Sequence, residues 1–275
     1  MTVKTMRLLC ALPAMGLLAL AMAGCAHLGR RYEESRPASD VPSAAEILAD
    51  LAQNDGAVRN LHASAVCVLR SPDLAAAEKF VGQVDFRRPA DLRILGRNQL
   101  GVLLFRLICV GSEFLMEFPK SNRPPYYRFE GEDFASVPFN VSPADIVGEM
   151  FLPEDWAVLG TNEVRLVHYN AEGSVPQATV EIGPKKRPRR RLTVLGHPWV
   201  VAESTRLGPE GEELAVTTRK EYETIDGIRL PKWIRAVFPP ENTEMVLDLR
   251  RIRPNVKMDD SLFEINWRPD EDQSY

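Results

Sequence analysis

Residues 61–69, LHASAVCVL, decide the class of fold, because apolar side chains occupy every second position along them. The same period of two returns in residues 79–87, KFVGQVDFR. Residues 102–110, VLLFRLICV, are nearly all apolar, and only Arg106 interrupts them. Because successive side chains of a strand point to opposite faces of its sheet, these three runs predict half-buried strands.

Turn residues separate the apolar runs at intervals of about 8–12 residues, which is typical of a sandwich or a barrel. Asp226-Gly227 has the residue types of a tight hairpin turn, in which both central residues need positive φ. We expect a mainly β domain of about eleven antiparallel strands, whose apolar face must be buried by something else in the fold.

Two short helices interrupt the strand pattern. The capping box SAAE at residues 43–46 predicts a helix from Ala44, and apolar positions recur at helical spacing through residue 52. Ser142 and Pro143 have the residue types of an N-cap and a first helical position, so they predict a second helix between two runs of strands.

The N-terminus has the pattern of a secretory signal peptide. Lys4 and Arg7 precede an apolar run over residues 8–23, and no acidic residue occurs before Glu33. The run ends in AMAGC, which resembles the bacterial lipobox and implies cleavage before Cys25 and acylation of that residue. An ordinary signal peptide with a chance cysteine is the alternative. Ala26, in place of Asp, is similar to the sorting pattern that favours the outer membrane.

These features divide the chain into four expected parts. They are a cleaved signal peptide over residues 1–24, the lipidated cysteine and a flexible tether over 25–42, one folded domain over 43–268, and a disordered tail over 269–275.

Charge and cysteine content exclude several classes of protein. The net charge is −4, which argues against a nucleic-acid partner, since such proteins are normally basic. Four cysteines in 275 residues do not make a disulfide scaffold. Cys67 and Cys109 fall on inward faces of separate strands, so we expect free buried thiols; a disulfide, which an envelope location would allow, is the alternative.

The sequence contains no motif of a known catalytic or metal site. H-E-x-x-H, G-x-S-x-G and phosphate-binding glycine loops are absent from it. His62, His168 and His197 lie in different segments, and we expect them to be ordinary surface or turn residues. We therefore predict a protein that is not an enzyme and has no metal and no cofactor.

One strong cluster of basic residues occurs in the chain, over residues 185–191. It could be a solvated hairpin loop, or its side chains could contact anionic lipid headgroups, for which a basic residue near a membrane gains about 1 kcal/mol. The candidates for headgroup contact are Lys185, Lys186, Arg187 and Arg189.

The order of these features resembles the bacterial outer-membrane lipoprotein carrier and receptor superfamily (LolA/LolB). A lipobox, a helix, a meander, a helical insertion and a second meander follow one another. Four stretches are similar to that group: NQLG at 98–101, WAVLG at 156–160, YETIDGIRLP at 222–231 and DSLFEI at 260–265. The resemblance implies an incompletely closed antiparallel barrel, with short helices covering a concave apolar face.

The resemblance also implies a function. The protein would be anchored in the outer membrane facing the periplasm, bind acyl chains of lipids or lipoproteins, accept clients from a soluble periplasmic carrier and assist their transfer. Alternatives are an envelope-stress sensor of lipoproteins or lipopolysaccharide on the same fold, a structural lipoprotein with a filled interior, and a hydrolase with an unusual site.

Two sets of residues follow as candidates for this function. Leu100 and Gly101 lie in an expected hairpin turn, where the apolar side chain of Leu100 would contact the membrane. The alternative is an exposed leucine without a role, since single exposed leucines are common. Side chains that alternate with charged neighbours would line a lipid cavity: Phe80, Val84, Phe86, Leu103, Phe105, Phe114, Met116, Met245, Leu247 and Leu249.

Overall fold

The computed structural model describes residues 41–72, 74, 76–111, 113–119, 126–128, 141, 143–150 and 163–266. The expected signal peptide, Cys25, most of the tether, Ser142, residues 156–160 and the expected tail lie outside the described residues. Within the described ranges, no helix has the length and apolar character needed to cross a membrane.

Thirteen strands of the described chain form one antiparallel sheet, which confirms the expected mainly β fold. The number exceeds the expectation partly because a strand as short as β6 cannot show a period of two. In chain order, the first six strands of the sheet are β1 Asn60–Arg70, β2 Glu78–Arg87, β3 Asp91–Arg97, β4 Leu103–Val110, β5 Glu113–Glu117 and β6 Tyr126–Arg128. The others are β7 Val164–Asn170, β8 Gln177–Ile182, β9 Arg190–Leu195, β10 Val200–Leu207, β11 Glu213–Ile225, β12 Ile228–Phe238 and β13 Thr243–Pro254.

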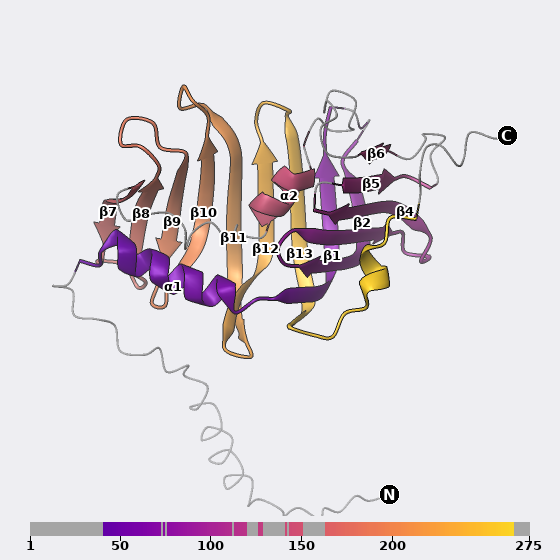
Figure 1. Cartoon of the computed structure of the whole chain (residues 1–275), viewed down its shortest axis with the longest axis horizontal. Helices are drawn as coiled ribbons and strands as arrows, with labels where there is room; N and C mark the ends of the chain where they lie inside the picture. The colour runs from indigo at the N-terminus through magenta and orange to yellow at the C-terminus, as the bar shows by residue number, and fades with distance from the viewer. Residues whose placement is uncertain are drawn as a thin grey trace, which may run out of the picture. The chain divides into compact units, whose positions relative to one another are not determined.

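The chain enters this sheet in its middle. From β1, strands β2 to β6 run outward to one edge; the second meander starts at the other edge with β7 and returns until β13 pairs with β1. Cys67 of β1 lies opposite Leu247 of β13 in this central pair. The sheet curls, so that β2, β4 and β5 run across the direction of β7–β11 (Figure 1), and its end strands β6 and β7 are not bonded to each other in the described part.

The hairpin between β11 and β12 has the predicted tight turn. Asp226 and Gly227 have φ of 50° and 79°, and Ile225 pairs with Ile228 on either side of them. Two consecutive positive φ values are the requirement of a type I′ turn, which matches the twist of the flanking strands. The Asp-Gly prediction is therefore confirmed.

Both predicted helices are present. Helix α1, Ala44–Gly56, begins at the capping box: Ser43 Oγ accepts from Glu46 N at 3.1 Å, and Glu46 Oε2 accepts from Ser43 N at 2.7 Å. Helix α2, Pro143–Met150, begins at the predicted proline. In Figure 1 α1 crosses the lower part of β7–β10. Helix α2 contacts β11 and β12.

The two helices cover two hydrophobic clusters on the same face of the sheet. Ile47, Leu48 and Leu51 of α1 pack with strands β7 to β10 and with Trp199, in what we call the α1 cluster. Ile146, Val147 and Met150 of α2 pack with strands β1 to β5 and β11 to β13, in the α2 cluster. The expected helical cover of an apolar sheet face is thus observed.

Aromatic side chains fill the middle of the α2 cluster. The rings of Phe80 and Phe105 stack with centroids 5.6 Å apart, although β3 lies between their strands. Gly96 of β3 makes this possible, because a Cβ there would lie 2.8 Å from the Phe80 ring. Phe118 packs against Phe105 from the other side, at 5.3 Å.

Cys67 and Cys109 are free and buried, as predicted. Their strands, β1 and β4, are separated by β2 and β3 in the sheet. Burial in this apolar cluster raises the pKa of Cys67 to about 12, since a thiolate would lose its hydration there. Both cysteines therefore act as small apolar side chains.

The opposite face of the sheet holds a buried carboxylate that the sequence did not predict. Asp85 is completely buried and accepts hydrogen bonds from Gln83 and from Arg93, whose Nη2 lies 2.7 Å away. His62 Nδ1 lies 2.6 Å from Asp85 Oδ1, so this histidine has a structural partner rather than the plain surface position expected.

A C-terminal 3₁₀ turn, Asp260–Phe263, contacts β3 and β4.

Candidate functional site

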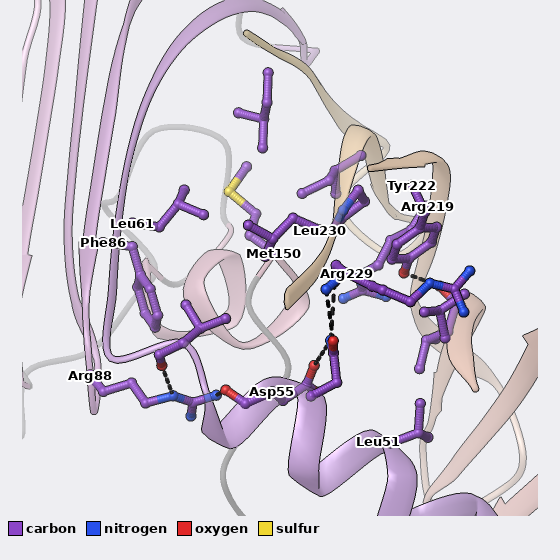
Figure 2. Close-up of a pocket in the computed structure, with 17 residues that line it drawn as sticks. Leu51, Asp55, Leu61, Phe86, Arg88, Met150, Arg219, Tyr222, Arg229 and Leu230 are labelled. Atoms are coloured by element: carbon purple, nitrogen blue, oxygen red, sulfur yellow. Dashed lines mark hydrogen bonds between the residues drawn. The ribbon is translucent and has the colours of Figure 1, made fainter. Parts of the chain in front are cut away.

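A cavity of about 60 Å³ lies between the two hydrophobic clusters (Figure 2). The C-terminal half of α1 forms one wall, β10 to β13 form another, and β1, β2 and Met150 of α2 complete it. Its volume holds a few water molecules, which need at least about 10–15 Å³ each, and is well below an engineered cavity of about 150 Å³ that binds benzene. In this conformation the cavity is a small space at the junction of both helices with the sheet.

Most of the cavity wall is apolar. The apolar side chains come from seven different elements or their ends, which makes the cavity the point where separate parts of the core converge. They are Leu51, Val58, Leu61, Phe86, Met150, Val200, Val201, Leu230, Pro231, Ile234 and Leu249.

Arg219 of β11 is the unusual group in this wall. Its side chain is 3% exposed, and its Nη2 donates to the backbone oxygen of Glu149 at 2.5 Å. Its Nη1 has no hydrogen-bond partner in the part of the chain that the structure describes. Burial lowers the pKa of Arg219, but a guanidinium stays protonated in proteins. A charged donor is therefore buried beside the cavity with part of its hydrogen-bonding capacity unused.

Asp55 faces the same cavity from the end of α1. Within the described ranges its Oδ2 has no hydrogen-bond partner, and its Oδ1 accepts a long 3.4 Å bond from Asn54. Burial raises the pKa of Asp55 to about 6, while Asn54, Arg219 and Arg88 act in the opposite direction. Loss of hydration thus outweighs the nearby positive charges, and the carboxylate is poorly accommodated at neutral pH.

Two further arginines complete the charged part of the wall. Arg88 donates from Nε to the Val58 backbone oxygen at 2.7 Å and from Nη2 to the Asp55 backbone oxygen at 2.8 Å, so it caps the C-terminal end of α1. Arg229 donates from Nη1 to the Pro198 oxygen. Tyr222 donates its hydroxyl to the Val201 oxygen at 2.6 Å, and burial raises its pKa.

Asn54 attaches α1 to the sheet at this point. Its Nδ2 donates to the Arg229 backbone oxygen at 3.0 Å, and its Oδ1 accepts from the Arg229 backbone nitrogen at 2.8 Å. The pair fixes the end of α1 against β12, next to the cavity (Figure 2).

Replacing Asp55 with asparagine is expected to stabilise the protein at neutral pH. A folded-state pKa of about 6 against 3.8 means that charging Asp55 costs stability increasingly as the pH rises from about 4 to 6, and fully above that. The variant should gain about 2–3 kcal/mol at pH 7.5 and almost nothing at pH 4. Chemical denaturation of both proteins at the two pH values measures this, and an equal gain at both would contradict the raised pKa.

A second charged cluster lies under α2. Glu149 is 1% exposed, and its carboxylate receives Nη2 of Arg190 at 3.0 Å and the hydroxyl of Thr217 at 3.0 Å. Nε of Arg206 lies 3.6 Å from the same carboxylate. We call these four residues the Glu149 cluster. These polar contacts attach α2 to β9, β10 and β11. The apolar residues of α2 pack against the sheet in the α2 cluster.

The predicted lipid-lining residues are largely brought together. Nine of the ten belong to the α2 cluster and are buried: Phe80, Val84, Phe86, Phe105, Phe114, Met116, Met245, Leu247 and Leu249. Leu103 is half-buried at the start of β4 and is not part of that cluster. Only Phe86 and Leu249 of the ten line the cavity. Contact with lipid stays a prediction for all of them.

Sequence reasoning missed the charged residues of this site. Thr217 and Arg219 stand at inward positions of β11, and Glu149 stands among the apolar residues of α2. The signal that could have revealed the site was a charged residue at a position where the strand or helix period predicts a buried side chain.

Leu100 lies at the tip of the β3–β4 hairpin with 88% of its surface exposed. The turn around it is ordered by Asn98, whose Oδ1 accepts from Leu100 N at 2.9 Å and from Val102 N at 3.0 Å. Gly101 has φ of 79°, a value that suits glycine. The turn therefore holds an apolar side chain outward on a defined backbone.

The basic residues 185–191 separate into two groups. Lys185, Lys186, Arg187 and Arg189 are exposed between β8 and β9. Arg190 instead belongs to the Glu149 cluster, and the Nη2 of Arg191 lies 3.1 Å from Glu181. Headgroup contact by the exposed group stays a prediction. Among the described residues, no cluster of three histidines, cysteines or carboxylates could hold a metal ion.

The fold is similar to that of three solved structures. A DUF1329 family protein from Desulfovibrio piger matches with a TM-score of 0.56 and 16% identity, over 82% of this chain and 98% of that one. A LolA superfamily protein from Nitrosomonas europaea matches with a TM-score of 0.52 and 13% identity, over 82% and 99%. A domain from Vibrio parahaemolyticus, described as an outer membrane lipoprotein-sorting protein, matches with 0.52 and 8%, over 80% and 97%.

The resemblance inferred from sequence is thereby confirmed at the level of the fold. No protein-family model and no curated protein matches the chain.

Proposed function

We propose that this protein is a membrane-anchored lipoprotein that binds acyl chains of lipids or lipoproteins and assists their transfer to the outer membrane. It is not an enzyme in this proposal. The observation that carries it is the apolar face of the sheet, over which the described part of the chain places two short helices. Short helices that lie on a sheet can separate from it without disturbing strand pairing, and an acyl chain can then take their place.

The anchoring part of the proposal rests on the sequence. Cleavage before Cys25 and acylation of that residue would attach the protein to the outer membrane, facing the periplasm, through a tether ending at residue 42. Residues 43–268 would then form the lipid-binding domain. Lys185, Lys186, Arg187 and Arg189 are exposed and available to anionic headgroups. The similarity in fold to a domain described as an outer membrane lipoprotein-sorting protein supports the same function. In this proposal a soluble periplasmic carrier would supply the clients.

Native mass spectrometry of the full chain purified from membranes tests both parts. The mass of the stripped protein should equal that of residues 25–275 plus acyl groups. Milder conditions should retain co-purified lipid. A mass that corresponds to an unmodified chain would contradict the anchor, and a protein that carries no lipid and takes up none from vesicles would contradict the binding function.

A structural lipoprotein with a filled interior is the second candidate. The small cavity favours it, because about 60 Å³ is far less than the roughly 300–1,000 Å³ of an ordinary ligand pocket. The two candidates differ in whether α1 and α2 move. Hydrogen exchange in the presence of lipid vesicles separates them: loss of protection confined to the helices supports lipid binding, and unchanged protection supports the filled interior.

Replacing Leu100 with glutamate is expected to abolish client transfer while leaving the fold and lipid binding intact. The side chain is exposed, so the fold loses little, but an apolar contact worth about 1.5–3 kcal/mol at a membrane surface would be removed. A transfer assay to liposomes with an acylated client measures the effect. Val167→Glu is the matched control, because Val167 is also exposed, at 55%, but lies on edge strand β7. Normal transfer by Leu100→Glu would exclude this role.

A further inference from the structure

The charges on the cavity wall do not balance. Arg88, Arg219 and Arg229 line the cavity, and Asp55 is the carboxylate that lines it with them. Glu149 lies nearby, but its carboxylate is occupied by Arg190 and Thr217 and it does not line the cavity. Among the described residues that line it, the wall therefore carries three positive charges against at most one negative charge.

Arg219 is the group for which this imbalance matters most. Arg88 and Arg229 use their guanidinium groups to bind backbone oxygens at the end of α1 and near Trp199. Arg219 has one such bond, to the Glu149 oxygen, and its Nη1 has no partner among the described residues although the side chain is 97% buried by surface area. A buried charged donor without a partner is costly, and an anion that reaches it forms a charge-assisted hydrogen bond.

The surroundings of Arg219 restrict the kind of anion. Apart from the three arginines, Asp55, Asn54 and Tyr222, the residues that line the cavity are leucine, valine, isoleucine, methionine, phenylalanine and proline. The cavity is lined by members of both hydrophobic clusters, such as Leu51 of the α1 cluster and Phe86 of the α2 cluster, and each cluster has further members outside the cavity wall. A small oxyanion attached to an apolar chain matches both features: the head would meet Arg219 and the chain would lie along a cluster beneath a helix.

We propose that the cavity at Arg219 binds the carboxylate or phosphate head of an anionic acyl compound, and that the site thereby selects anionic over neutral lipids. The inference rests on the proposed function and narrows its ligand class. The cavity accommodates the head in the present conformation, whereas the chain requires α1 or α2 to move. Asp55 opposes binding through its negative charge, so it tunes the affinity of the same site.

The experiment compares ligands that share one chain and differ in the head. The full chain in a non-ionic detergent is titrated by native mass spectrometry with palmitate, 1-palmitoyl lysophosphatidate, neutral 1-palmitoylglycerol and inorganic phosphate. The two anionic lipids should bind about 10- to 100-fold more tightly than palmitoylglycerol, the ratio expected for one charge-assisted hydrogen bond. Comparison of the two anionic lipids tells a carboxylate from a phosphate source, and inorganic phosphate shows whether the chain is needed.

Three variants assign the preference to this cavity. Arg219→Met should reduce the preference to near unity, and Asp55→Asn should tighten the binding of both anionic lipids at pH 7.5. Arg191→Met should change nothing, because that arginine is paired with Glu181 and lies outside the cavity. If Arg219→Met does not fold, the Asp55→Asn result and the headgroup ratio still decide the matter.

The outcomes distinguish this inference from the proposed function. Equal binding of neutral and anionic lipids would overturn the anion site and leave acyl binding intact. A preference that Arg219→Met retains would also overturn it. Tight binding of inorganic phosphate alone would replace the lipid head with a free anion. Binding of none of the four probes would overturn both proposals.

Discussion

Replacing Phe105 with alanine is expected to lower the free energy of unfolding by about 3–5 kcal/mol, the usual range for a buried phenylalanine. Phe105 is 2% exposed and contacts Phe80 and Phe118 on its two sides, so its removal leaves a gap between two rings that strand pairing holds in place. Chemical denaturation measures the effect. Leu100→Ala on the preceding turn is the control and should change stability by less than about 0.5 kcal/mol.

The same position also tests whether lipid shares this part of the interior. Phe105→Trp adds volume without adding charge, so it should reduce lipid uptake if acyl chains lie against the Phe80–Phe105 pair. Lipid uptake equal to that of the unchanged protein, in a variant that is folded by its melting curve, would place the acyl chains elsewhere. A loss of stability by Phe105→Ala of under 1 kcal/mol would show that the ring is not packed as described.

Local features of this fold were predictable because local chemistry determines them. The capping box at Ser43 satisfies backbone donors within one turn, and Asp226-Gly227 supplies two residues that tolerate positive φ. The alternating strands follow from the same logic, since one face had to be apolar. The capping box, the Asp-Gly turn and the alternation along each strand depend on residues close together in the sequence, and the structure has each of them at the predicted residues.

Long-range pairing was not predictable in the same way. The contact between β1 and β13 joins residues about 180 positions apart, and nothing in an alternating pattern specifies the partner strand. Asp85 shows a related limit. The period put it on the outer face, as observed, but its complete burial depends on His62, Gln83 and Arg93, which come from three neighbouring strands.

The residues of the candidate site also fall into a predictable group and a group that depends on long-range contacts. Nine of the ten apolar residues assigned to the interior gather in the α2 cluster, because the hydrophobic effect acts on all of them without regard to partner. The charged residues of the cavity and of the Glu149 cluster depend on specific partners from different elements. Arg219, for example, needs the backbone of α2 to satisfy one of its donors.

Replacing Glu149 with alanine is expected to destabilise the protein by about 3–5 kcal/mol, because it leaves buried positive charge without a counterion. Arg190 and Arg206 both approach its carboxylate, and Arg219 binds its backbone oxygen. Since the carboxylate is contacted by Arg190 of β9, Arg206 of β10 and Thr217 of β11, its loss should first release α2 from the sheet. Chemical denaturation and hydrogen exchange of α2 measure the two effects.

Asp145→Ala is the matched control on the same helix. Asp145 pairs with Arg206, but both side chains are about one-third exposed, and such pairs contribute only about 0–1 kcal/mol. A double variant, Glu149→Met with Arg190→Met, separates charge from packing. It should recover much of the stability lost by Glu149→Ala, because an apolar pair replaces the buried ion pair. If the double variant is as unstable as Glu149→Ala, the cluster stabilises α2 by shape rather than by charge, and α2 is not held to the sheet by its ion pairs.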